Sequence, residues 1–152
     1  MAVNDLSDPE IARLADKVRE YEQLYNFGTA DFSRARLEHL YKRDEDFTAY
    51  DVAPPVGGYL GWSQYAKGWD HLLGKFSQFN FEVNDDLRVF RRGEVGWASM
   101  SCATSGKSAD GVAFRKELRL TLTFVNDDGN WLITQEHCST PRLFELPGGG
   151  QI

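Results

Sequence analysis

Three polar side chains stand at or near the strands that the sequence predicts. Asp51 directly precedes a Pro-Pro loop, Arg119 lies in the longest predicted strand, and His137 lies near the end of the last one. A carboxylate beside an imidazole can fix its tautomer and raise its pKa, so that the pair can move a proton. A guanidinium can hold a carboxylate or enolate oxygen through two parallel hydrogen bonds. The three residues are therefore candidates for one polar cluster.

Each of these residues also has a purely structural interpretation. His137 could tie the first predicted strand to the last as a buried, hydrogen-bonded histidine. Asp51 could cap its loop by accepting a hydrogen bond from the backbone of Val52 or Ala53. Arg119 could form a structural ion pair with Asp51 or with a neighbouring acid. A cluster in which these groups satisfy one another would look the same in the sequence, so both interpretations stay open.

The elements that must position these residues follow a segregated order. Apolar residues spaced by three and four predict helices over residues 7–28, 31–41 and 62–76. Alternating and apolar runs predict strands over 46–52, 78–93, 94–105, 111–125 and 129–141, with a bulge or bend near 84–86. Three helices and a meander of strands indicate a single α+β domain over residues 1–152. Residues 1–6 and 147–152 are expected to be flexible tails.

Strict alternation divides each strand into two faces. In the last strand, one face then carries Trp131, Ile133, Gln135, His137 and Ser139. The other face carries Leu132, Thr134, Glu136 and Cys138. In the preceding strand, Arg119 and Thr121 lie on one side and a row of leucines lies on the other. Both faces of the sheet therefore carry apolar residues. Since the helices can cover only one face, we expect a homodimer that covers the other.

Composition argues against several classes of function. The chain of 152 residues has a net charge of −6 and a pI near 5.0, which disfavours nucleic acids and anionic membranes as partners. No apolar run approaches the roughly 20 residues of a membrane span. Cys102 and Cys138 lack metal-ligand spacing, and no pattern indicates a metal or a cofactor. The N-terminus has no secretory signal, so we expect a cytoplasmic protein.

Two segments resemble those of a known family. The first, FTAYDVAPPVGGYLGWSQYAKGW at 47–69, resembles the strand, Pro-containing loop and aromatic helix of SnoaL-like proteins. The second, RLTLTFVNDDGNWLITQEHCS at 119–139, resembles their closing hairpin, with an Arg-x-Thr strand, an acidic Gly turn, a Trp and a His-x-Ser sequence. On these motifs the chain is identified as a member of the nuclear transport factor 2-like superfamily. That superfamily includes ketosteroid isomerase and the SnoaL-like polyketide cyclases.

The resemblance implies a cone-shaped fold, in which a curved antiparallel or mixed sheet wraps around three N-terminal helices and encloses an apolar cavity. It also implies that the first strand lies beside the last, which would bring Asp51 near His137. We expect Asp51, His137 and Arg119 to be catalytic. The expected ligand-binding residues are Tyr25, Trp62, Tyr65, Trp69, Trp97, Thr121, Gln135 and Ser139.

The expected ligand is a small apolar molecule. The expected activity is cofactor-free acid–base chemistry on an apolar carbonyl compound, such as isomerisation, cyclisation, dehydration or hydrolysis. The alternatives are a non-catalytic ligand carrier and a homodimerisation module of the same fold. A pocket without any group of strongly perturbed pKa would favour the carrier, and a filled interior would favour the dimerisation module.

Overall fold

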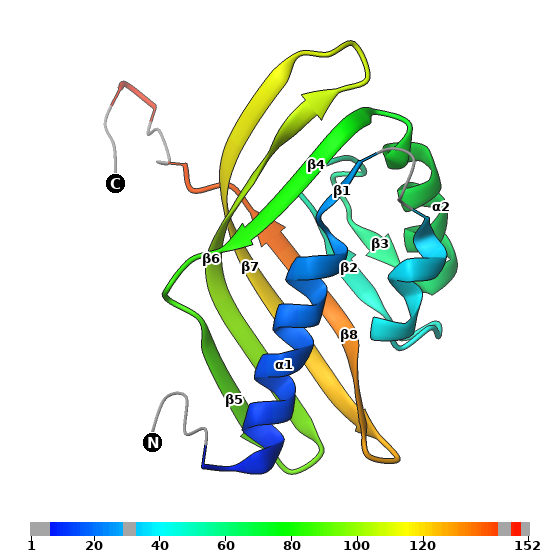
Figure 1. Cartoon of the computed structure of the whole chain (residues 1–152), viewed down its shortest axis with the longest axis vertical. Coiled ribbons are helices and arrows are strands. Elements are labelled where there is room, and N and C mark those ends of the chain that lie inside the picture. The colour runs from blue at the N-terminus through cyan, green and yellow to red at the C-terminus, as the bar shows by residue number, and fades with distance from the viewer. Residues whose placement is uncertain (1–6, 29–32, 143–146, 150–152) are drawn as a thin grey trace.

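The computed structural model describes residues 7–28, 33–142 and 147–149. Figure 1 shows two α-helices packed on one face of a large curved sheet. The elements are, in chain order, α1 (Pro9–Leu24), β1 (Phe27–Gly28), two 3-10 turns (Arg34–Arg36 and Glu38–Leu40), β2 (Thr48–Tyr50), β3 (Tyr59–Leu60), α2 (Trp62–Leu73), β4 (Phe76–Val83), β5 (Arg88–Arg92), β6 (Val95–Ser108), β7 (Ala113–Asp127) and β8 (Asn130–Ser139). Of the predicted tails, residues 1–6 and 150–152 lie outside the described residues.

The first predicted helix is confirmed as α1. Asp8 caps it by accepting a hydrogen bond from the backbone N–H of Glu10 at 2.9 Å, and Pro9 occupies the first turn, where its missing N–H costs nothing. The buried face carries Ile11, Leu14, Ala15, Val18 and Tyr21, which is the periodicity that the sequence shows. This face lies across the sheet, so the C-terminal end of α1 delivers tyrosines to the interior.

The second predicted helix is not an α-helix. Residues 34–36 and 38–40 form two 3-10 turns, while residues 31 and 32 lie outside the described part of the chain. Leu37 and Leu40 are buried, so the apolar positions still face the core. The third predicted helix is confirmed as α2, which begins at Trp62 and ends at Leu73, before Gly74.

The described strands form one eight-stranded sheet in the order β1-β4-β6-β7-β8-β2-β3, with β5 paired to β6. The sheet is mixed, because β2 runs parallel to β8 whereas the other named pairs are antiparallel. The expected contact between the first and last predicted strands is thus confirmed, with Ala49 opposite Glu136 and Tyr50 opposite His137.

The predicted strand over 78–93 is interrupted at the expected position. It divides into β4 and β5, which pair with different parts of β6 and are separated by a turn at Asp85 and Asp86. The phase shift in the sequence therefore marks a break in the strand, and β4 is free to lean over the interior of the sheet.

A β-bulge in β8 overturns the predicted faces of that strand. Phe124 pairs with Ile133 and Thr123 pairs with Gln135, so Thr134 is an extra residue in β8. A bulge of this kind shifts the alternation by one position. Ile133 faces the interior before the bulge and Glu136 faces it afterwards, whereas His137 is exposed. The prediction that Trp131, Ile133 and His137 share one face is wrong.

The hairpin of β6 and β7 projects beyond the rest of the sheet (Figure 1). Gly106 in β6 has a φ of +153°, and a Cβ added there would lie 2.1 Å from the carbonyl oxygen of Gln78 in β4. Only glycine can accept such an approach without moving the backbone. Gly106 thus allows β4 to pair closely with β6 beside the register shift between Phe76 and Gln78. Among the described residues, no helix has the length and apolar character needed to span a membrane.

Candidate functional site

A cavity of about 350 Å³ lies between the inner face of the sheet and the two α-helices. Its wall is mostly apolar and is built by α1, α2, β4, β6, β7 and β8. The apolar and aromatic residues that line it are Tyr21, Tyr25, Val52, Ala53, Trp69, Leu72, Phe76, Phe79, Phe81, Phe114, Leu118 and Leu120. The polar remainder is Asp51, Thr104, Lys116, Glu136, Cys138 and Thr140. Such a hollow suits a small apolar ligand that is oriented by a few polar groups.

The cavity has a buried floor and a more exposed rim. The buried residues are Tyr21, Tyr25, Trp69, Phe81, Thr104, Leu118, Leu120 and Glu136. Val52 and Lys116 are exposed, and Phe76 and Phe114 are half-buried with their ring centroids 5.4 Å apart. A ligand would therefore enter past Lys116 and the phenylalanines and would meet Glu136 at the inner end.

Glu136 is a buried carboxyl group on the floor of the cavity, with 5% of its surface exposed. The hydroxyl of Tyr41 donates a 2.9 Å hydrogen bond to its Oε2, and the hydroxyl of Tyr65 donates a 2.8 Å hydrogen bond to its Oε1. Each carboxylate oxygen has a second lone pair. Two phenols thus hold the group in place without using up its capacity to accept a proton.

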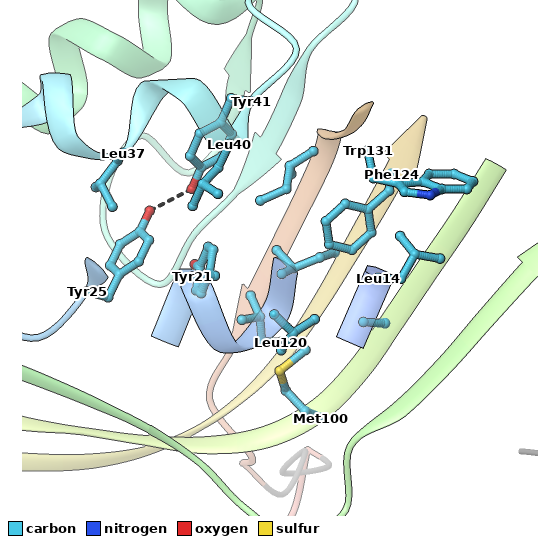
Figure 2. Close-up of a cluster of buried hydrophobic side chains, with 14 of the residues drawn as sticks. Leu14, Tyr21, Tyr25, Leu37, Leu40, Tyr41, Met100, Leu120, Phe124 and Trp131 are labelled. Carbon is cyan, nitrogen blue, oxygen red and sulfur yellow. Dashed lines mark hydrogen bonds between the residues drawn. The ribbon is translucent and has the colours of Figure 1, made fainter. Parts of the chain in front are cut away.

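A third tyrosine extends this network to α1. The hydroxyls of Tyr25 and Tyr41 lie 2.7 Å apart and point toward each other in Figure 2. Because Tyr41 donates to Glu136, Tyr25 donates to Tyr41. Burial, and then the nearby charge of Glu136, raises the pKa of Tyr25, Tyr41 and Tyr65, so all three phenols are neutral donors. Tyr25 is the member of this chain that lines the cavity.

The environment of Glu136 moves its proton affinity into the neutral range. Burial, and after it the charge of Asp51, raise its pKa from 4.5 to about 7, although the hydrogen bonds from Tyr65 and Tyr41 oppose the rise. A carboxyl group with this pKa exists in both protonation states near pH 7. It can therefore accept a proton and return it without a large energetic penalty.

Asp51 lines the same cavity, directly beyond the end of β2. Its Oδ1 accepts a 2.6 Å hydrogen bond from the backbone N–H of Val52, so the predicted capping of the loop is confirmed. Burial raises the pKa of Asp51, while backbone hydrogen bonds from Val52 and Ala53 oppose the shift. The cavity thus carries two carboxyl groups in different environments.

The other predicted pocket residues of the interior take several positions. Tyr25 and Trp69 line the cavity. Tyr65 lies behind Glu136 and binds it. Trp62 packs on Tyr41, with ring centroids 5.2 Å apart, and supports the tyrosine network from the side away from the cavity wall.

The remaining predicted site residues lie on the outer face of the sheet. Arg119 and His137 are exposed, and His137 contacts the ring of Tyr50, with centroids 5.6 Å apart. Trp97 stacks on Phe90. The side chains of three further residues also lie on this outer face and are half-buried: Thr121, Gln135 and Ser139.

The structure therefore does not bring Asp51, Arg119 and His137 together inside the cavity. Asp51 and His137 border one open groove at the end of β8, but no hydrogen bond joins them in the described part of the chain. The physical reason is the bulge at Thr134, which turns Glu136 inward and His137 outward. Strict alternation had placed Glu136 on the opposite side.

Sequence reasoning missed Glu136, Tyr41 and Lys116 as members of the site. The sequence does contain a signal for Glu136. Cys138, a small apolar residue, alternates in step with Glu136 and out of step with Ile133, which indicates that the two share the inner face. The alternation along β7 does place Lys116 on the same side as the leucines, but a single lysine on that face did not indicate a role in the site. Tyr41 carried no signal, since a single tyrosine after a short apolar run reads as core.

Comparison with known proteins identifies the family. The sequence profile of the SnoaL-like domain matches residues 21–142, so the chain belongs to the SnoaL-like domain family. Solved structures of nuclear transport factor 2-like proteins share its fold. No curated protein matches this sequence.

Three solved structures illustrate the range of proteins with this fold. A nuclear transport factor 2-like superfamily protein from Salmonella enterica has a TM-score of 0.78 at 16% identity, covering 95% of this chain and 99% of its own. A Streptomyces avermitilis protein, whose name proposes a dehydratase activity, has a TM-score of 0.72 at 13% identity. The match covers 90% of this chain and 99% of that protein. The association domain of CaMKII from C. elegans has a TM-score of 0.58 at 13% identity. The match covers 89% of this chain and 96% of that domain. At these identities the likeness establishes the fold alone.

Proposed function

We propose that this protein is a cofactor-free acid–base enzyme that acts on a small apolar carbonyl compound, with Glu136 as the proton-transfer group. The observation that carries the proposal is the position of Glu136, which is buried on an apolar cavity with its pKa raised to about 7. The dehydratase activity proposed for the Streptomyces avermitilis protein is the same kind of chemistry.

In the proposed reaction, ionised Glu136 accepts a proton from the carbon next to the carbonyl group. The C–H electron pair becomes the double bond of an enolate, and negative charge develops on the carbonyl oxygen. Tyr21 lines the cavity with a neutral hydroxyl, which can donate to that oxygen, whereas the hydroxyl of Tyr25 already donates to Tyr41. Protonated Glu136 then returns the proton to another carbon, or to a departing hydroxyl group.

Asp51 has a supporting role in this proposal. Its charge raises the pKa of Glu136, and its position on the same cavity makes it a second acid–base group. Arg119 and His137 have no part in the proposed reaction, because their side chains lie on the outer face of the sheet. The proposed location is the cytoplasm, in line with free thiols at Cys102 and Cys138.

Nitrobenzisoxazole offers a direct test, because any well-placed base can open its ring. Removal of its C–H proton breaks the N–O bond and releases a coloured phenolate. We expect release above the buffer rate, increasing with pH around an apparent pKa of about 7. Glu136→Gln should lower the rate by at least about a hundredfold. Exposed Glu82→Gln is the matched control. Equal rates for wild type and Glu136→Gln would contradict the assignment.

A second role as a homodimer is favoured by the outer face of the sheet. Phe90 and Trp97 stack there with centroids 5.2 Å apart, and Val95, two residues before Trp97 in β6, is 45% exposed. An apolar patch of this kind is suited to a second copy of the chain. Sedimentation equilibrium should then report a dimer, and Trp97→Lys should report a monomer. A wild-type monomer would contradict this role without affecting the proposed chemistry.

A further inference from the structure

Lys116 is a cation on the rim of an otherwise apolar entrance. It lies in β7 opposite Thr104 of β6, and both residues line the cavity. Its nearest inward neighbours along the strand are Phe114 and Leu118. Among the described residues that line the cavity, Lys116 is the one with a basic side chain. It forms no ion pair with any residue in the described part of the chain. Its neighbours Arg115 and Glu117 pair with each other at 3.1 Å.

The cavity therefore has a charge gradient along its length. Asp51 and Glu136 supply acidic groups, with Glu136 on the floor, and Lys116 supplies a positive charge at the rim. Glu136 pairs with Leu122 of β7. The six positions from Leu122 to Lys116 correspond to about 20 Å along the strand at roughly 3.3 Å per residue. An anionic group would be repelled by the floor and attracted to the rim.

We infer that the natural ligand is an elongated apolar compound with a carboxylate at its outer end, which Lys116 binds at the rim. The inference rests on the proposed function for the inner end of the ligand, where the reacting carbon lies beside Glu136. Apolar surroundings strengthen a charge pair, and Phe76 and Phe114 provide them at the entrance. The gradient fixes the orientation of the ligand as well as its class, because the reverse orientation would place an anion beside two carboxyl groups.

The test compares three probes of one chain length: decanoate, decanol and decylamine. Isothermal calorimetry gives a Kd for each with wild type, with Lys116→Met and with Lys107→Met. The control is well matched, because Lys107 is an exposed lysine of the same hairpin, pairs with Ala113, and does not line the cavity. Each variant removes one positive charge, so a general effect of net charge would be equal in both.

Wild type should bind decanoate roughly threefold to tenfold more tightly than decanol, as expected for a half-exposed ion pair. Lys116→Met should abolish this preference, so that decanoate and decanol have similar Kd values, whereas Lys107→Met should preserve it. Equal Kd values for decanoate and decanol, a preference for decylamine, or equal effects of the two variants would overturn the inference and leave the proposed chemistry intact. Absence of binding by all three probes would also overturn the inference, whereas the proposed chemistry is decided separately by the turnover of nitrobenzisoxazole.

Discussion

The hydroxyl of Tyr65 lies 2.8 Å from Oε1 of Glu136, although 71 residues separate the two in the chain. This hydrogen bond joins α2 to β8 across the interior. It also opposes the rise in the pKa of Glu136 that burial causes. The pair therefore connects the packing of a helix on the sheet with the protonation of the cavity floor.

Tyr65→Phe should destabilise the protein and raise the pKa of Glu136 above about 7. The variant removes one donor from a buried carboxyl group, and such a loss costs about 1–3 kcal/mol. The cost should be larger when the carboxylate is ionised, at about pH 8, than at about pH 5. Urea unfolding at the two pH values measures both effects. Tyr59→Phe is the control, because its hydroxyl donates to Pro54 at an exposed position. A larger loss for Tyr59→Phe would contradict the assigned role of Tyr65.

The stability of the wild type should fall relative to Glu136→Gln as the pH rises. Below pH 4.5 the carboxyl group is protonated in both the folded and the unfolded chain. Between 4.5 and about 7 the unfolded chain releases the proton while the folded chain keeps it, so folding is disfavoured. The complete change amounts to roughly 3 kcal/mol. Urea unfolding of both proteins from about pH 4 to about pH 8 measures it, because the other groups cancel in the comparison. A pH-independent difference would show that Glu136 does not titrate in this range.

Asp51→Asn should lower the pKa of Glu136, since the charge of Asp51 helps to raise it. The pH at which nitrobenzisoxazole turnover reaches half its maximum should move to lower values. His137→Gln should leave that pH unchanged, because His137 is exposed on the outer face. If His137→Gln caused the larger shift, the imidazole would contribute to the chemistry as the sequence first suggested.

Gly106→Ala should cost several kcal/mol and disturb the pairing of β4 with β6. The added Cβ would lie 2.1 Å from the carbonyl oxygen of Gln78, at a φ that disfavours side chains. Gly57→Ala is the control, because its Cβ would meet nothing within 4 Å, and it should change stability by less than about 0.5 kcal/mol. Thermal unfolding of the two variants measures the difference. Similar melting temperatures for both would mean that the pairing of β4 with β6 adapts easily to the added side chain.

The fold was largely predictable because its signals are local or come from a family resemblance. The cap at Asp8 and the periodic apolar residues after it determine α1, and acidic glycine turns separate the long strands. The contact of β2 with β8 followed from the resemblance and is confirmed. The second helix was misassigned, because the spacing of the five apolar residues over 31–41 is compatible with two 3-10 turns as well as with one α-helix.

The site was less predictable than the fold, because it depends on one irregularity that composition does not encode. Asp51, Tyr25 and Trp69 were placed on the cavity, since each follows the regular phase of its element. Glu136 was placed on the wrong face, because the extra residue Thr134 changes the phase of β8. A bulge is decided by pairing with a distant strand, and no pattern within the strand specifies it.

The same bulge divides one strand into two regions under different constraints. Before Thr134, Trp131 and Ile133 are almost completely enclosed, so substitutions there govern whether the chain folds. After it, Glu136 and Cys138 border the hollow, so substitutions there govern what is bound. Substitutions in the second half of β8 can therefore alter ligand preference while the packing of the first half is kept, so that one architecture can serve different ligands.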